Sequence, residues 1–284
     1  MIDNTLGQIP GLVTIGEGWY VWRRGMLNNC YCGCSRRFEQ CEFWNAVFRE
    51  AFGEADRKDL KMMFDIFRPL SFYQLGMYFG IHSKKLKEAK KNIEKLYLAI
   101  AKVSGCNMIV DSSKWASYGR LLSDIPAFDV RNIHIVRDPR AVTFSWKRKK
   151  KYEPLADSDF YYKQYSVFRS TFEWIIWNSS IEVLKKPFKQ KYHPLRYEDF
   201  VKLPQKEIQE ILRFAGEGER KVKMKRNRIM PMNNHCIAGS SLRFNSGDIE
   251  IKLDNQWQDD MSRMGKLIVT ILTLPFLWLY RYKL

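Results

Sequence analysis

The sequence lacks the features that mark secreted or membrane-spanning chains. Six cysteines in 284 residues are too few for a disulfide scaffold, and no basic leader with an apolar core opens the chain. The longest apolar run, Leu267 to Tyr280, is shorter than the roughly 20 residues that a membrane-spanning helix needs. Internal repeats and low-complexity linkers are also absent from the sequence. We therefore predict a cytoplasmic protein with a single globular domain over residues 1–284.

Two segments of that domain stand apart. Residues 264–284 are predicted to form a C-terminal apolar helix, which is first interpreted as a buried helix or one at an interface. Its basic end, with Arg281 and Lys283, also fits peripheral contact with a membrane. Residues 53–83 carry no recognisable motif, and we expect them to be an insertion.

Acidic residues are scarce relative to basic ones. The chain has 31 Asp and Glu against 48 Lys and Arg, which gives a formal charge of +17 and favours polyanionic partners. The runs Lys147 to Lys151 and Arg220 to Arg228 are typical of solvated helix faces, although they could also steer an anionic acceptor. Nucleic-acid binding is the alternative function from another class. Because no recognised nucleic-acid motif accompanies the charge, we expect no nucleic-acid partner.

Short apolar runs alternate with helical patterns along the chain. The runs 107–110 and 132–136 end in polar clusters and predict buried strands, and a third strand is predicted at 192–197. Helices are predicted at 84–103, 160–185 and 205–215. This order predicts an α/β fold with a mostly parallel central sheet flanked by helices. Ligands in such sheets bind at the carboxyl ends of the strands.

The segment that follows the strand 132–136 predicts an anion site. Asp138 is a good N-cap and Pro139 suits the first helical position, so Arg137 lies on a turn beside the positive end of a helix. Ser145 comes two turns later. A guanidinium group and a hydroxyl group so placed could hold one phosphate, although an ordinary capped helix with a surface arginine fits the same spacing.

This segment resembles the 3'-phosphate-binding motif of sulfotransferases that use 3'-phosphoadenosine 5'-phosphosulfate (PAPS). In that family an arginine on the turn and a serine eight residues later hold the 3'-phosphate of the nucleotide. The resemblance therefore implies these roles for Arg137 and Ser145.

Other segments are similar to the same family. Residues 195–200 resemble a downstream strand and helix, which implies that Tyr197 lies near the adenine. Residues 235–247 resemble the loop that closes over the nucleotide and supply Arg243, and residues 16–44 resemble bacterial members. The resemblance implies a P-loop-kinase-like sulfotransferase fold, PAPS as donor, and a hydroxyl or amine acceptor. By family analogy, this acceptor is a carbohydrate or a glycolipid.

One motif of the family is missing. The glycine-rich loop that binds the 5'-phosphosulfate occurs nowhere in the 284 residues, and residues 1–11 resemble the end of the helix that follows this loop. We therefore expect the fold to lack its first strand. Two interpretations stay open: the printed start is internal to a longer functional enzyme, or the chain is a degenerate relative with little transferase activity.

Sulfuryl transfer requires positioning, deprotonation of the acceptor and stabilisation of the leaving group. Lys114, in the Asp-Ser-Ser-Lys cluster, could place its ammonium near the bridging oxygen, although a solvated lysine fits the same pattern. Glu17 matches the region where some family members carry an acidic base. The sulfuryl group carries less charge than a phosphoryl group, so we predict no metal ligand and no required metal. His134, inside an apolar strand, is predicted to be a hydrogen-bonded core histidine.

Four cysteines cluster near the N-terminus. Cys30, Cys32, Cys34 and Cys41 have the density of a metal site, but their alternating spacing, without a nearby histidine, is not that of a standard zinc pair. Structural zinc, a disulfide and unmodified thiols are all compatible with this pattern.

Overall fold

The computed structural model describes residues 1–54, 60–68, 71–81, 83–149, 161–185, 191–220, 224–225, 227–229, 234–245 and 247–283. The chain divides into two compact units. Unit 1 contains residues 1–130 and 220–250, and unit 2 contains residues 131–219 and 251–284. Each unit is built from two separate segments of chain. The single domain over residues 1–284 stays a prediction.

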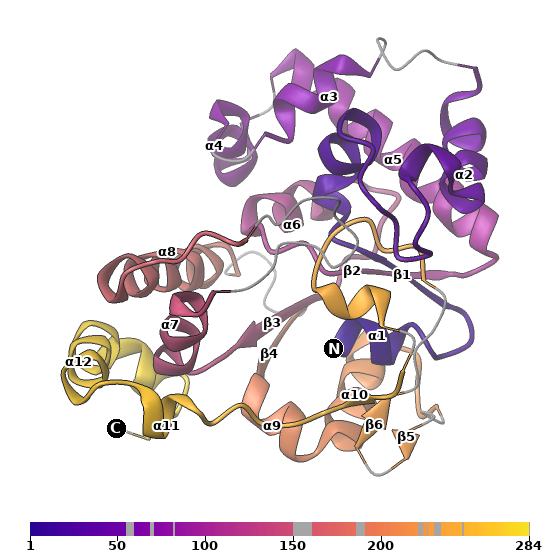
Figure 1. Ribbon diagram of the computed structural model, residues 1–284. Helices are drawn as coiled ribbons and strands as arrows, with labels where there is room; N and C mark the ends of the chain where they lie inside the picture. Colours follow the sequence, from indigo (N-terminus) through magenta and orange to yellow (C-terminus); the bar gives the residue numbers. More distant parts are fainter. Residues whose placement is uncertain are drawn as a thin grey trace. The chain divides into compact units, whose positions relative to one another are not determined.

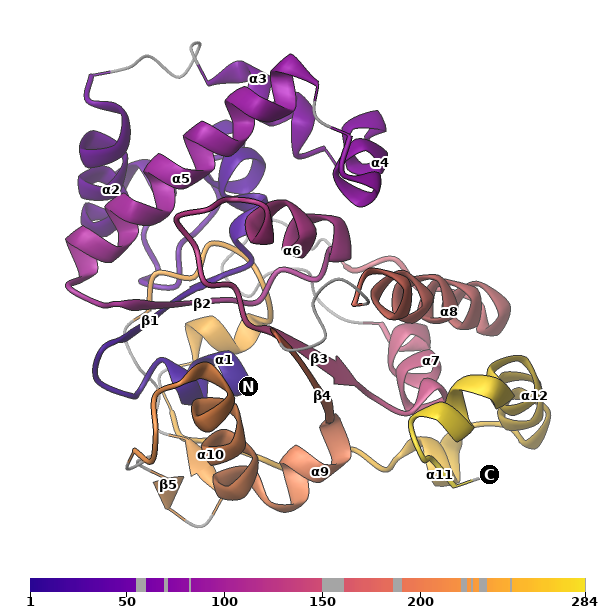
Figure 2. The ribbon, with the colours of Figure 1, turned by 180° about the vertical axis from the view of Figure 1, so that it is seen from behind.

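Unit 1 is built on two parallel strands, β1 (Leu12–Gly16) and β2 (Met108–Asp111). Figures 1 and 2 show α1 on one side of this strand pair and helices α2 to α6 on the other. The helices of unit 1 are α1 (Ile2–Leu6), α2 (Glu42–Phe52), α3 (Lys61–Ile66), α4 (Phe72–Phe79), α5 (Lys84–Ser104) and α6 (Ala116–Ser123). Short 3-10 and π turns, η1 (Gly18–Tyr20), η2 (Val21–Leu27) and η3 (Phe38–Gln40), connect β1 to α2.

The longest helix of unit 1, α5, confirms the helix predicted at 84–103. The Ser83 hydroxyl accepts a hydrogen bond from the Leu86 amide, which satisfies one of the unpaired donors at the helix start. Gly105 ends the helix in the left-handed conformation, at φ 66°. Ile93 and Ile100 are buried on the face that the sequence periodicity predicts.

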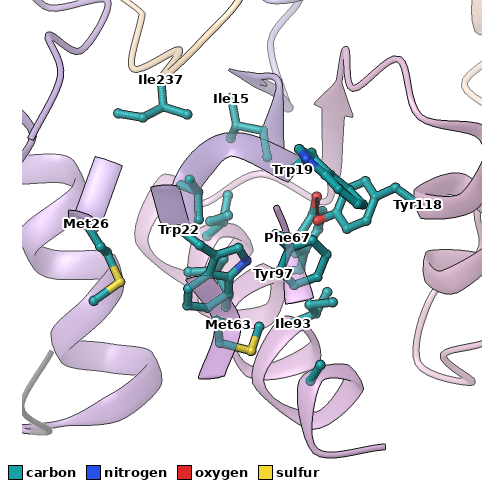
Figure 3. Close-up of a cluster of buried hydrophobic side chains, with 14 of the residues drawn as sticks. Ile15, Trp19, Trp22, Met26, Met63, Phe67, Ile93, Tyr97, Tyr118 and Ile237 are labelled. Carbon is teal, nitrogen blue, oxygen red and sulfur yellow. Dashed lines mark hydrogen bonds between the residues drawn. The ribbon is translucent and has the colours of Figure 1, made fainter. Parts of the chain in front are cut away.

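The core of unit 1 is rich in large aromatic side chains. Trp19, Trp22 and Trp44 are fully buried. Figure 3 shows Trp19 and Trp22 beside Phe67, whose ring stands edge-on to Trp19 with ring centroids 4.9 Å apart. Aromatic side chains of this size bury more apolar surface than any other residues, so this cluster dominates the stability of the unit.

Unit 2 is built on the parallel strands β3 (Asn132–Val136) and β4 (Tyr192–Arg196). Helices α7 (Pro139–Lys147), α8 (Val167–Leu184) and α12 (Arg263–Leu279) pack against one another (Figures 1 and 2). Helices α9 (Tyr197–Lys202) and α10 (Pro204–Ala215) follow β4, and the short α11 (Trp257–Asp260) contacts α7. The strand predicted at 132–136 is confirmed to the residue.

The sheet differs from the expected one. The described strands form two parallel pairs, β1–β2 and β3–β4, instead of one central sheet. A separate antiparallel sheet contains β5 (Met224–Lys225), β6 (Arg228–Ile229) and β7 (Ile249–Glu250). The α/β class and the parallel pairing are confirmed, whereas one central sheet is not found among the described strands. Alternation of strands and helices along the sequence does not encode which strands are neighbours.

Several element boundaries differ from the predicted ones, and the strand predicted at 107–110 is β2, one residue further along the chain. The strand predicted to reach Tyr197 ends at Arg196, and Tyr197 begins α9. The helix predicted from residue 160 begins at Val167, because the Ser166 hydroxyl accepts a hydrogen bond from the Arg169 amide and caps the helix there. Residue 160 itself lies outside the described residues.

Among the helices that the structure describes, none is long and apolar enough to cross a membrane. Helix α12, which carries most of the longest apolar run of the sequence, has 17 residues and contains Pro275.

Candidate functional site

The carboxyl ends of β1 and β2 bring two predicted residues together. Gly16 lies opposite Asp111 in the strand register, so the segments that follow the two strands are adjacent. Glu17 comes directly after β1, and Lys114 comes three residues after β2. The Lys114 ammonium donates to the Glu17 carboxylate. The Glu17 side chain is 11% exposed and the Lys114 side chain 71%, so the lysine reaches the pair from solvent.

Asp111 holds the turn that carries Glu17. Its carboxylate accepts hydrogen bonds from the Gly18 amide at 3.2 Å, the Ser113 amide at 2.7 Å and the Tyr97 hydroxyl. Burial raises the pKa of Asp111, while the bonds from Ser113 and Tyr97 oppose that increase. A Cβ at Gly18 would collide with the Asp111 carboxylate, so the close approach requires glycine. The sequence shows Asp111 only as part of a polar cluster and gives no signal for this positioning role.

Arg243 fixes a loop in the same unit. It lies in the short turn η5 (Ser241–Phe244), is buried, and donates to the Gly239 carbonyl at 3.1 Å. The adjacent Ala238 carbonyl accepts a hydrogen bond from the Glu17 amide at 3.3 Å. Arg243 therefore stabilises the loop that contacts the backbone at Glu17. Its predicted contact with a nucleotide stays a prediction.

In unit 2, the turn between β3 and α7 has the predicted form. The Asp138 carboxylate accepts a hydrogen bond from the Arg140 amide at 2.8 Å, and Pro139 occupies the first helical turn. The Arg137 carbonyl accepts a hydrogen bond from the Trp174 indole at 3.1 Å. The backbone at Arg137 is therefore fixed at the start of a capped helix, where the helix dipole favours an anion.

The Arg137 side chain lies between an aromatic ring and a carboxylate. Its guanidinium lies 4.9 Å from the centroid of the Tyr197 ring, so the structure brings these two predicted residues together. It also pairs with Asp254 at 3.4 Å, and Arg148 pairs with the same carboxylate oxygen at 2.7 Å. Two guanidinium groups therefore share the Asp254 carboxylate.

Electrostatics at this cluster follow from those contacts. Burial acts against ionisation of Asp254, but the hydrogen bond and charge of Arg148 and the charge of Arg137 lower its pKa. Burial raises the pKa of Tyr197, and the positive charge of Arg137 opposes that increase. Asp254 is thus an ionised partner of both arginines, and no motif in the sequence had indicated it.

The predicted residues fall into two groups. Ser145 is buried at the seventh position of α7 and belongs to unit 2 with Arg137 and Tyr197. Glu17, Lys114 and Arg243 belong to unit 1. The functional roles of all six residues stay predictions.

His134 has the predicted structural role. It is buried on β3, where Nδ1 lies 2.7 Å from the Tyr192 hydroxyl and Nε2 lies 3.0 Å from the Asn178 side-chain oxygen. An amide oxygen only accepts, so Nε2 carries the proton and Nδ1 accepts from the tyrosine. Both ring nitrogens are satisfied, which confirms the core histidine.

Comparisons with known proteins give two matches. The family model described as a sulfotransferase domain matches residues 42–252. A solved structure, the sulfotransferase domain from the curacin biosynthetic pathway, matches over 94% of this chain and 98% of that chain, with 15% sequence identity and a TM-score of 0.38. No curated protein matches this sequence.

Proposed function

The chain belongs to the sulfotransferase domain family, and we propose that it transfers a sulfuryl group from PAPS to a hydroxyl or amine acceptor. The observation that carries the choice of donor is the placement of the Arg137 guanidinium. It lies at the start of a capped helix, against the Tyr197 ring and near a second arginine. We include the P-loop-kinase-like fold and the cytoplasmic location in the same proposal.

The donor side of the proposal assigns the 3'-phosphate to Arg137. A guanidinium group binds phosphate through two parallel hydrogen bonds, and a phosphate dianion carries more charge than the Asp254 carboxylate that now pairs with Arg137. Ser145 would add a hydroxyl contact. Tyr197, held against the guanidinium, would lie along the adenine.

The acceptor side assigns proton transfer to Glu17. Its carboxylate takes the proton from the acceptor hydroxyl or amine as the new bond to sulfur forms. The bond between sulfur and the bridging oxygen breaks, and the bisphosphate leaves. Lys114, whose side chain is largely exposed and contacts Glu17, supplies the positive charge for the leaving oxygen. This scheme requires no divalent metal.

The acceptor class is the least constrained part of the proposal. Family resemblance favours a carbohydrate or a glycolipid, and the excess of basic residues favours an acceptor that carries negative charge.

The donor assignment is tested by binding of adenosine 3',5'-bisphosphate. A ligand at 100 times its Kd adds about 2.7 kcal/mol to the stability of the folded state, so the melting temperature of the wild type should increase. Arg137→Ala should abolish this increase. Arg169→Ala is the control: it removes an exposed arginine of α8 that pairs with Glu173, and the increase in melting temperature should be the same as in the wild type. Equal stabilisation of Arg137→Ala and the wild type would refute the 3'-phosphate site.

The assignment of Glu17 is tested separately by turnover. Glu17→Gln keeps the size of the side chain but removes the base, so the transfer of sulfate from PAPS to a sugar acceptor should slow by about 10²-fold to 10⁴-fold. Stabilisation by the bisphosphate should persist in this variant. Normal turnover in Glu17→Gln would exclude this residue as the base without affecting the donor site.

We also propose that α12 makes the peripheral membrane contact that a lipid-linked acceptor would require. Its exposed apolar side chains recur at helical spacing, and basic residues flank them. The apolar residues are Met264, Leu267, Ile271 and Trp278, and the basic residues are Lys266, Arg281 and Lys283. An apolar face with a basic border is typical of helices that lie in the membrane interface.

Vesicle co-sedimentation tests this contact. The full chain should sediment with anionic vesicles, and the double variant Leu267→Ser and Ile271→Ser should lose this binding because it loses the apolar face. Leu98→Ser, which changes an exposed leucine of α5, is the control. Undiminished binding of the double variant would contradict the proposal.

A further inference from the structure

Three cysteines and one histidine from distant parts of unit 1 converge on one point. The Sγ atoms of Cys32, Cys34 and Cys41 and a ring nitrogen of His235 all lie within 4.8 Å of one another. Cys32 and Cys41 are fully buried, and the other two side chains are partly buried. The cysteines come from the loop before α2, whereas His235 is about 200 residues further along the chain.

The distances between these atoms match the edges of a zinc tetrahedron. Zinc–sulfur bonds of about 2.3 Å and zinc–nitrogen bonds of about 2.0 Å separate two sulfurs by about 3.8 Å, and a sulfur from a nitrogen by about 3.5 Å. Cys41 Sγ lies 3.7 Å from both Cys32 Sγ and Cys34 Sγ. His235 Nδ1 lies 3.3 Å from Cys41 Sγ and 3.9 Å from Cys32 Sγ. A disulfide would need sulfurs about 2.05 Å apart.

The backbone around the cysteines is shaped to hold these positions. The Cys32 amide donates to the Arg36 carbonyl, and the Ser35 amide donates back to the Cys32 carbonyl, each at 2.8 Å. Ser35 is left-handed at φ 63°, which closes the loop tightly. A Cβ at Gly33 would collide with the side-chain oxygen of Asn234, so glycine is required where the two segments meet.

His235 is oriented by contacts other than those with the cysteines. The Trp44 indole donates to its carbonyl at 2.8 Å, and the Phe43 ring stacks on its imidazole with ring centroids 4.5 Å apart. The Gly33 amide donates to the Cys236 carbonyl at 2.9 Å. The histidine ring is thus fixed by α2 with Nδ1 directed at the sulfurs.

We propose that Cys32, Cys34, Cys41 and His235 bind one structural zinc ion. Binding of Zn²⁺ releases one proton from each of the three thiols and forms three zinc–sulfur bonds and one zinc–nitrogen bond, without any change in oxidation state. All four positions are taken by protein ligands, so the ion has no open position for substrate. The site is independent of the proposed transfer reaction, which needs no metal.

The ion would couple the N-terminal loop to the segment that supports Glu17. Two residues after His235, the Ile237 amide donates to the Ile15 carbonyl at 3.2 Å, and the following Ala238 carbonyl accepts a hydrogen bond from the Glu17 amide. An ion held by two segments so distant in sequence stabilises the folded state, because its four ligands come together only in the folded chain.

Metal analysis of the full chain tests the proposal. Protein purified under reducing conditions without chelator should contain about one zinc per chain. Cys41→Ser should lose the ion, while Cys106→Ser, which changes a cysteine outside the group, should retain it. Replacement of zinc by cobalt should give the absorption bands of a tetrahedral site with thiolate ligands. His235→Ala should weaken these bands, and His235→Cys should preserve a tetrahedral site.

Three results would contradict the zinc site. Folded wild type that contains no zinc and gives no cobalt bands would overturn the proposal, as would a mass two hydrogens below that of the reduced chain, which indicates a disulfide. Zinc retained undiminished in Cys41→Ser would place the metal elsewhere. If Cys41→Ser does not fold, the cobalt spectra of the wild type and of His235→Cys decide the question.

Discussion

Unit 1 and unit 2 are stabilised in different ways. In unit 1 a continuous cluster of buried side chains contains three fully buried tryptophans, and its apolar residues come from β1, α2, α3, α5 and α6. In unit 2 one cluster of buried side chains surrounds Val136 and Trp174, another group of buried apolar residues lies on α9 and α10, and the buried pair of Asp138 and Arg140 belongs to the same unit. Apolar burial gains free energy without precise geometry, whereas a buried charge must keep its partner. The units should therefore respond differently to the same kind of substitution.

The largest effect is expected in the core of unit 1. Trp22→Ala removes a fully buried ring and should lower the free energy of unfolding by about 3–5 kcal/mol, because the cavity cannot be filled by its neighbours. Urea denaturation measures the loss, and hydrogen exchange of peptides from each unit locates it. Exchange should accelerate most in unit 1. An equal acceleration in both units would show that they unfold together and would break the comparison.

A slightly smaller effect is expected from the buried ion pair of unit 2. Arg140 donates twice to Asp138, at 3.0 Å and 2.7 Å, and both side chains are about 90% buried. Arg140→Met keeps the apolar stem but leaves the carboxylate without its cation, which should cost about 3 kcal/mol. The double variant Asp138→Asn and Arg140→Met should recover part of this loss in urea denaturation. A double variant less stable than Arg140→Met would contradict the explanation.

A moderate effect of pH is expected from His134. Burial, the first cause, lowers the pKa of this histidine below its ordinary value of about 6.5. The unfolded chain therefore binds the proton more readily than the folded chain. The contribution of neutral His134 to the free energy of unfolding is fully present above pH 6.5, and it is lost as the pH falls below that value towards the pKa of the folded state. Melting temperatures between pH 5 and pH 8 measure it, and His134→Gln should show a flatter profile than the wild type.

The smallest effect is expected at exposed ion pairs of unit 2. Arg169 and Glu173 pair at 2.9 Å across one turn of α8, with the arginine side chain 52% exposed. Arg169→Ala should change the free energy of unfolding by less than about 0.5 kcal/mol, because solvent and salt screen the pair. If Arg169→Ala lowered the free energy of unfolding as much as Arg140→Met, burial would not explain the difference expected between the exposed and the buried ion pair.

Local features of the candidate site were predictable from the sequence. The strand 132–136, the Asp138 cap and Pro139 were all identified, and the structure places them as predicted. Each depends on residues within a few positions of one another, where backbone geometry and hydrogen bonding are set locally. Tyr197 was assigned to a strand and lies instead at the start of α9, because strand and helix boundaries depend on the pairing partner.

The partners of these residues were not predictable. Asp254 joins Arg137 from a position 117 residues later, and His235 joins the three cysteines from a position about 200 residues later. The same limit explains the separation of the strands into two parallel pairs, because the sequence pattern does not specify which strands are neighbours.

The sequence by itself determined the α/β class, the strands β2, β3 and β4, the helices α5, α8 and α10, and the capped turn at Arg137. Periodicity of apolar residues and the chemistry of caps act over a few residues, so they can be read along the chain. Only the tertiary structure decided that Glu17 meets Lys114, that Asp254 pairs with two arginines, and that His235 completes a group of three cysteines. Such contacts depend on the path of the whole chain, because each one joins segments that are adjacent only after folding.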